Sequence, residues 1–179
     1  MKNLAWARII QREVSSTPER LLVGVLGNRK AGKSHTWNTL FGRTVRRGIR
    51  PHRLTLRPGE CVEVFLVSGS FEERREYAGR ILRNQACRIV LCSMQYTNEV
   101  HRTLDYFIDK NFYLNIQWLN PGYHDAGETW DRLGLANQIL AHTSVFAIRN
   151  GKINARSRVG EMRQFIYSWA RYRNLIVPC

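Results

Sequence analysis

The chain of 179 residues is long enough for one domain with a sizeable core and rather short for two, so we treat residues 1–179 as a single domain. Its composition, 44% hydrophobic and 23% charged, is that of a globular protein and excludes a disordered or fibrous one. The apolar runs fall far short of the ~20 residues that a membrane-spanning helix needs, and the first residues do not form a secretory signal. We therefore expect a cytoplasmic protein with no membrane span.

The net charge of +14 is unevenly distributed. Residues 1–60 hold 13 of the 28 basic residues but only 3 of the 14 acidic ones. Such an excess attracts polyanions and makes association depend on salt. The expected partner is a nucleic acid or an acidic protein. The chain could also be part of a larger complex. A basic surface that only aids solubility is the alternative.

The four cysteines are Cys61, Cys87, Cys92 and Cys179. They form no C-x-x-C pair, and no histidine lies at zinc-finger spacing from them. Two of them lie inside apolar, strand-like runs. The pattern favours reduced thiols that serve as small core residues.

The first elements predicted in chain order are a helix, a strand and a second helix. An amphipathic helix is expected over residues 3–14, inside an N-terminal helical extension of residues 1–18. A short apolar run over residues 21–26 predicts a buried strand. Helical spacing of apolar residues then predicts a helix over residues 33–41, which Gly42 ends.

The segment between this strand and this helix fits the phosphate-binding pattern G-x-x-x-x-G-K-[ST], with Gly27, Gly32, Lys33 and Ser34 at the four defined positions. Glycines let several backbone N–H groups turn inward toward a polyphosphate, and the start of the helix adds a partial positive charge. Lys33 would contact the β- and γ-phosphates, and the Ser34 hydroxyl would bind Mg²⁺. A glycine-rich turn with a solvated lysine is the structural alternative.

Residues 43–57 carry six arginines, one histidine and no acid, which predicts a mobile, strongly basic loop. If this loop folds over the phosphates, Thr44 or Thr55 could supply a second hydroxyl to Mg²⁺. One of its arginines could contact the γ-phosphate as an arginine finger does.

The remainder of the chain alternates strands and helices. Strands are expected over residues 61–67, 88–92, 112–119 and 144–148, and helices over residues 72–84, 97–110, around 130–140, and 156–173. Asn120-Pro121-Gly122 and Asn150-Gly151 predict turns. This alternation predicts an α/β three-layer sandwich around a mostly parallel sheet.

The phosphate loop, followed by WNTLFG at residues 37–42, resembles the first motif of the Ras-like GTPases, which belong to the P-loop NTPases. The order of elements over residues 21–173 is also similar. The resemblance implies a P-loop fold of Ras-like topology that binds GTP or ATP with Mg²⁺. The implied nucleotide ligands are Gly27, Asn28, Arg29, Lys30, Ala31, Gly32, Lys33, Ser34, His35 and Asn120, and the implied metal ligands are Ser34 and Thr55.

Two further motifs of that family are degenerate here. The strand over residues 61–67 ends in Ser68-Gly69 without the aspartate of D-x-x-G, and residues 88–93 contain no acid either. The guanine-reading motif N-K-x-D is reduced to Asn120, with Asp125 two positions too late. An incomplete metal site predicts slow hydrolysis, because metal positioning carries most of this catalysis.

Three functions remain open at this point. The first is a nucleotide-binding switch with weak or absent NTP hydrolysis, whose basic loop is ordered by phosphate contacts. The second is a P-loop adaptor subunit that has lost hydrolysis. The third is a small-molecule or nucleotide kinase, against which stands the lack of an acidic base at a strand end.

Overall fold

The computed structural model describes residues 17–46, 48, 50–120 and 131–179. The helix expected over residues 3–14 and the aspartate at position 125 lie outside these residues. The strands are β1 (Arg20–Gly27), β2 (His52–Arg57), β3 (Glu60–Val67), β4 (Ile89–Gln95), β5 (Phe112–Leu119), β6 (Ser144–Arg149) and β7 (Val177–Pro178). The helices are α2 (Lys33–Phe41), α3 (Phe71–Arg74), α4 (Ala78–Leu82), α5 (Val100–Asp109), α6 (Leu135–Leu140) and α7 (Arg156–Tyr172).

The strands form one sheet in the order β2-β3-β4-β1-β5-β6, with β7 added alongside β3. Strand β1 lies at the centre, parallel to β4 on one side and β5 on the other. The β3–β4 and β5–β6 pairs are also parallel, whereas β2 and β7 run antiparallel to β3. The sheet is therefore mixed but mostly parallel, and β4 separates β3 from the central strand.

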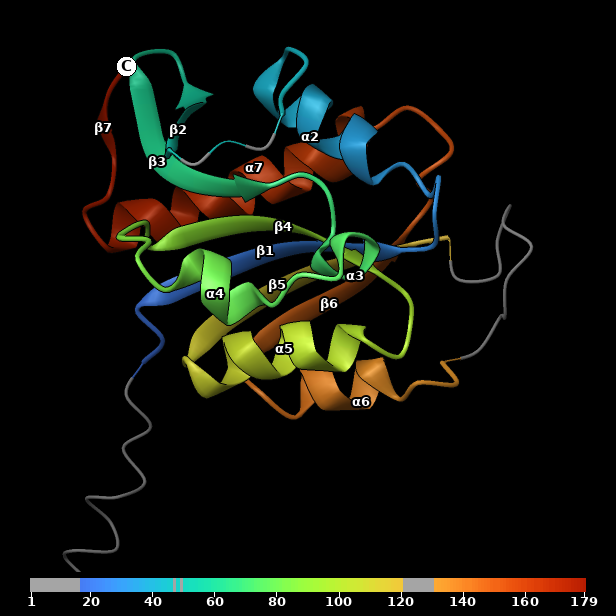
Figure 1. Cartoon of the computed structure of the whole chain (residues 1–179). Helices are drawn as coiled ribbons and strands as arrows, with labels where there is room; N and C mark the ends of the chain where they lie inside the picture. Colours follow the sequence, from blue (N-terminus) through green and yellow to red (C-terminus); the bar gives the residue numbers. More distant parts are fainter. Residues whose placement is uncertain (1–16, 47, 49, 121–130) are drawn as a thin grey trace, which may run out of the picture.

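Helices cover both faces of this sheet (Figure 1). Helices α2 and α7 pack on one face, and α3, α4, α5 and α6 pack on the other. Strands β1, β4 and β5 are buried on both faces, which explains their nearly continuous apolar sequences. The α/β class and the three layers are as expected.

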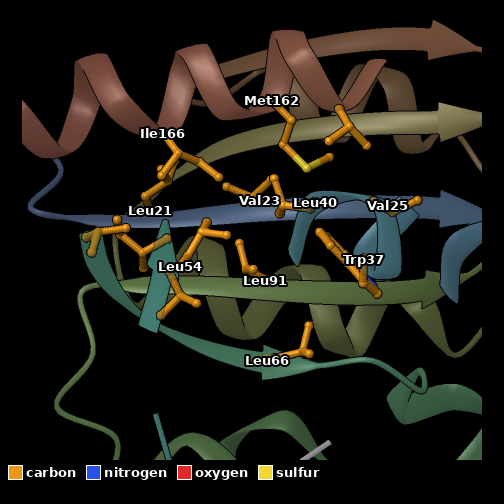
Figure 2. Packing of buried hydrophobic residues seen from close by; sticks show 14 of the residues in the cluster. Leu21, Val23, Val25, Trp37, Leu40, Leu54, Leu66, Leu91, Met162 and Ile166 are labelled. Atoms are coloured by element: carbon orange, nitrogen blue, oxygen red, sulfur yellow. The ribbon is translucent and has the colours of Figure 1, made fainter. Parts of the chain in front are cut away.

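The core beneath α7 fixes the position of α2, the helix that follows the phosphate loop. Figure 2 shows Trp37 and Leu40 of α2 in the same cluster as Val23 of β1 and Met162 and Ile166 of α7. Trp37 is fully buried. Burial of a large aromatic side chain contributes about 1.5–3 kcal/mol. The start of α2 is thus held rigidly against the sheet.

Strand β7 was not expected, and α6 begins at Leu135, later than the helix expected around residues 130–140. Two other segments differ more from the sequence-based expectation. Residues 52–57 of the basic loop form strand β2, in which buried Leu54 and Leu56 alternate with exposed polar residues. The helix expected over residues 72–84 is divided into α3 and α4. Arg75 interrupts it with a φ of 54°, a left-handed conformation that a helix cannot contain.

Cys61 and Cys179 form a disulfide, so the expectation of reduced thiols is wrong for these two residues. The bond ties the C-terminal β7 to the start of β3, which its antiparallel pairing brings close. Cys87 and Cys92 are free, buried thiols, as expected. Burial raises the pKa of both, and that of Cys92 rises well above its usual value.

We expect the substitution Cys179→Ser to lower the free energy of unfolding by about 2–4 kcal/mol, because the disulfide joins residues 118 positions apart and restricts the unfolded chain. Denaturant unfolding of both proteins measures the difference. Reducing agent should destabilise the wild type by a similar amount and leave the variant unchanged. Equal sensitivity of both proteins to the reductant would contradict a formed bond.

Within the ranges given above, no helix combines the length and the apolar character that crossing a membrane requires.

Candidate phosphate-binding site

The phosphate loop connects the carboxyl end of β1 to the first turn of α2. Within it, Lys30 and Gly32 have φ values of 65° and 101°. A side chain at Gly32 is excluded for a second reason, since a Cβ there would lie 2.3 Å from the carbonyl oxygen of Gly151. Both the backbone conformation and the close contact with Gly151 therefore require glycine at position 32.

The Lys33 side chain turns back into the curve of the loop. Its Nζ donates to the carbonyl oxygens of Gly27 (2.9 Å) and Asn28 (2.8 Å), and the residue is only 7% exposed. Ser34 and His35, the next two residues, are exposed. The loop thus holds an ammonium group inside its curve and presents a hydroxyl beside it.

The amino end of α2 adds to the positive character of the loop. Its first turn contains no acidic residue, and no side chain caps its backbone N–H groups. Such N–H groups carry the partial positive charge of the helix and bind anions readily. Arg29 and Lys30 are exposed on the loop itself. The sequence-predicted residues from Gly27 to His35 are therefore contiguous in space and cationic.

Asn120, at the end of β5, holds the back of the loop. Its Nδ2 donates to the carbonyl oxygen of Ala31 (3.1 Å), and its Oδ1 accepts from the backbone N–H of Gly151 (2.6 Å). A Cβ on Gly151 would lie 2.0 Å from the same Ala31 oxygen, so only glycine allows this close approach. Lys152 donates from Nζ to the carbonyl oxygen of Lys30 (3.0 Å). The predicted residue Asn120 is thus brought to the loop, where its amide joins two backbone segments.

Arg158 of α7 connects α2 with the segment that follows β6. Although buried, its guanidinium donates to Thr36 Oγ1 (both contacts 3.2 Å) and to the carbonyl oxygens of Asn150 (3.2 Å) and Ile153 (3.3 Å). Thr36 Oγ1 in turn donates to Gly32 O (3.1 Å). Burial lowers the pKa of Arg158. All of these acceptors are neutral, so this cation serves to position backbone around the loop.

Ser34 is the predicted Mg²⁺ ligand in the loop, and the strand beside β1 is where an acidic partner would be needed. The strand beside β1, β4, has two polar residues near its carboxyl end, Ser93 and Gln95. The Ser93 hydroxyl accepts from Trp37 Nε1 (2.8 Å) and donates to Ser68 O (2.8 Å). Among the described residues, no three histidine, cysteine, aspartate or glutamate side chains come together as a metal site would require. The residues present fit phosphate, and of the predicted metal ligands only Ser34 lies at the loop.

The carboxylate of Glu72 on α3 lies at the end of β4. It accepts from the backbone N–H of Gln95 (2.9 Å) and from the hydroxyl of Thr103. These bonds tie α3 to β4 and α5. This carboxylate is the acid nearest in sequence to the degenerate second motif, and its role in the structure is to hold elements together.

Thr55 is not brought to the loop, so the prediction that it binds metal fails on geometry. Thr55 pairs with Cys61 near the amino end of β3, and its hydroxyl lies 3.4 Å from the Cys61 sulfur. The carboxyl end of β3, not this end, faces the same edge of the sheet as Gly27, because β3, β4 and β1 are parallel.

Sequence reasoning missed Gly151, Lys152 and Arg158. The first was assigned only to a turn, and Arg158 was one of many arginines in a helix. No local pattern marks their contacts with the loop, because the partners lie more than 100 residues away in sequence. Compared with models of known protein families and with curated protein sequences, the chain gives no match.

Proposed function

We propose that this protein binds a nucleoside triphosphate, GTP or ATP, at the phosphate loop. The observation that carries the proposal is the Lys33 ammonium inside the loop, next to an α2 amino end that has no acidic residue. A triphosphate would take the place of the Gly27 and Asn28 carbonyl oxygens as the acceptor for Lys33. The exposed Ser34 hydroxyl would then contact Mg²⁺ bound to the phosphates.

The protein acts in this proposal as a GTPase-like switch with weak or absent hydrolysis. Ser93 supports this, because the end of β4 offers a hydroxyl already bonded to Trp37 and Ser68 where a metal-positioning acid would be needed. Nucleotide binding then sets the affinity for a polyanionic partner. The net charge of +14 would attract such a partner.

The same bond between Trp37 and Ser93 favours a second candidate, a P-loop adaptor subunit without hydrolysis. In that case the fold serves as a basic scaffold in a larger nucleic-acid or protein assembly. The two candidates differ in one measurable property, which is nucleotide binding.

Titration of fluorescent GTP and ATP analogues, with and without Mg²⁺, tests the proposal. We expect the wild type to bind and Lys33→Ala to weaken binding by about 10–100-fold, because a hydrogen bond to a charged group contributes about 1.5–3 kcal/mol. Lys110→Ala, which removes an equal charge from the exposed end of α5, is the matched control and should bind as the wild type does. If none of the three proteins bound nucleotide, the switch proposal would be wrong and the adaptor candidate would be favoured.

A further inference from the structure

A groove lined by arginines lies at the opposite end of α2 from the phosphate loop. Its volume is about 520 Å³, and it is bounded by the end of α2, strand β2 and helix α7. Figure 1 shows α2 and α7 on one face of the sheet, at the end where β2 forms its edge. The arginines that line it are Arg43, Arg53, Arg57 and Arg163, and no acidic residue lines it. We call this the basic groove.

Arg163 is held in place on the wall of the basic groove. Its Nη2 donates to the carbonyl oxygen of Leu40 (2.6 Å) in the last turn of α2. Its Nε is buried and has no hydrogen-bond partner among the described residues. An unpaired buried donor is unfavourable. Arg163 as a whole is half-buried and lines the groove, so the accessible part of its side chain can contact an acceptor bound there.

The arginines of the basic groove are not paired with acidic side chains. Within the described part of the chain, none of the four forms a salt bridge with an aspartate or glutamate, and Arg53 Nη1 donates to the main-chain oxygen of Cys179 (3.5 Å). The guanidinium of Arg57 lies 3.7 Å over the Tyr167 ring. Burial, and secondly the charge of Arg43, lower the pKa of nearby His52. These observations describe a region of positive potential in which no described aspartate or glutamate side chain is paired with the four arginines.

Phe41 and Pro58 give the basic groove a small accessible apolar surface. Leu40, Leu54 and Leu56 are buried beneath it, and the half-buried Phe41 ring lies edge-on to His52. A ligand that fits must therefore combine closely spaced negative charges with surface that can rest on apolar groups. A free inorganic anion meets only the first requirement.

We propose that the basic groove binds the phosphodiester backbone of a nucleic acid. This inference rests on the proposed function in one respect, the polyanionic partner, and it identifies where that partner binds. Of the 28 basic residues 23 are arginines, whose planar guanidinium matches phosphate geometry better than an ammonium does. Sugars and bases would contact Phe41 and Pro58, as they contact aromatic side chains in single-strand-binding grooves.

The regularity of its charge favours nucleic acid over an acidic protein segment. A nucleic-acid strand carries a negative charge at every nucleotide, whatever its sequence. Alternate side chains of an extended peptide point away from a groove that it occupies, so an acidic segment presents a carboxylate at every second residue at most. Four arginines line the basic groove, and a phosphodiester strand supplies a regular series of charges to them.

The test compares two charge-reversed double variants by anisotropy of fluorescent oligonucleotides, single-stranded and duplex. Arg43→Glu with Arg53→Glu alters the basic groove, and Arg80→Glu with Arg83→Glu makes the same charge change on or next to α4, on the other face. All four side chains are exposed, so both variants should fold. Between about 50 and 200 mM salt, the slope of log affinity against log salt counts the phosphate contacts.

We expect the groove variant to bind at least ten times more weakly and to lose about two phosphate contacts from its salt slope. The α4 variant should change affinity less than about threefold, and binding should raise the pKa of His52, followed by NMR. Equal losses in both variants, or no binding by the wild type, would overturn the proposal. So would exclusive binding of an acidic polypeptide such as polyglutamate, which would assign the groove to a protein.

Lys33→Ala separates this inference from the nucleotide proposal. If the groove is the nucleic-acid site, Lys33→Ala should bind the oligonucleotide as the wild type does, even where it has lost GTP or ATP. If instead Lys33→Ala abolishes oligonucleotide binding, the polyanion site is the phosphate loop and the groove assignment is wrong.

Discussion

Replacing Arg158 by leucine is expected to lower the free energy of unfolding by about 3 kcal/mol. Arg158 is 3% exposed, and its guanidinium donates to the buried Thr36 Oγ1 and to the part-buried carbonyl oxygens of Asn150 and Ile153. A buried acceptor left without a donor costs about 1–3 kcal/mol. Relief of the buried charge offsets part of this loss, because none of the acceptors is a carboxylate.

Arg156→Leu is the matched control for this prediction. Arg156 lies two residues earlier on α7 and is exposed, so its substitution should change stability by no more than about 0.5 kcal/mol. Both variants are measured by denaturant unfolding monitored by tryptophan fluorescence. If Arg158→Leu were as stable as Arg156→Leu, the hydrogen bonds of the Arg158 guanidinium would have no net energetic value.

The Arg158 contacts also show what sequence can and cannot predict in this fold. The helix over residues 33–41 was predicted with the bounds that the structure has, since both its start at the phosphate loop and its end at Gly42 are marked locally. Gly42 adopts a φ of 66°, the usual conformation of a glycine that ends a helix. Features marked by adjacent residues were therefore predictable.

Features that depend on distant partners were not. Strand β2 was hidden because six arginines in 15 residues dominate the pattern, although Leu54 and Leu56 alternate as a half-buried strand requires. The disulfide joins cysteines 118 positions apart, and spacing alone cannot pair them. Arg75 has no sequence signal for its left-handed conformation, which is uncommon for arginine.

Asn120 gives the clearest case of a residue whose position was predicted and whose role needed the structure. The resemblance to Ras-like GTPases suggested a residue that reads the base. In the structure its amide joins the phosphate loop to Gly151 instead, with both polar atoms used. These are different roles, and they predict different results with GTP and ATP.

We expect Asn120→Asp to weaken GTP and ATP binding equally, by about tenfold or more. The carboxylate keeps an acceptor for the Gly151 N–H but places a second acceptor against the Ala31 carbonyl oxygen, 3.1 Å away in the wild type. Repulsion there displaces the loop that holds Lys33, so phosphate contacts are lost whichever base is attached. The free energy of unfolding should also fall by about 1–3 kcal/mol, since the site is buried.

Asn150→Asp provides the control, because Asn150 Oδ1 only accepts from the backbone N–H of Lys152 and a carboxylate can do the same. Nucleotide titrations of both variants, made at equal concentration of folded protein, separate a loop effect from a loss of stability. If Asn120→Asp lost affinity for GTP but not for ATP, the joining role would be contradicted. Asn120 would then be a residue that recognises the base. Because its two amide atoms face Ala31 and Gly151 within the folded chain, the joining role requires that both nucleotides lose affinity together.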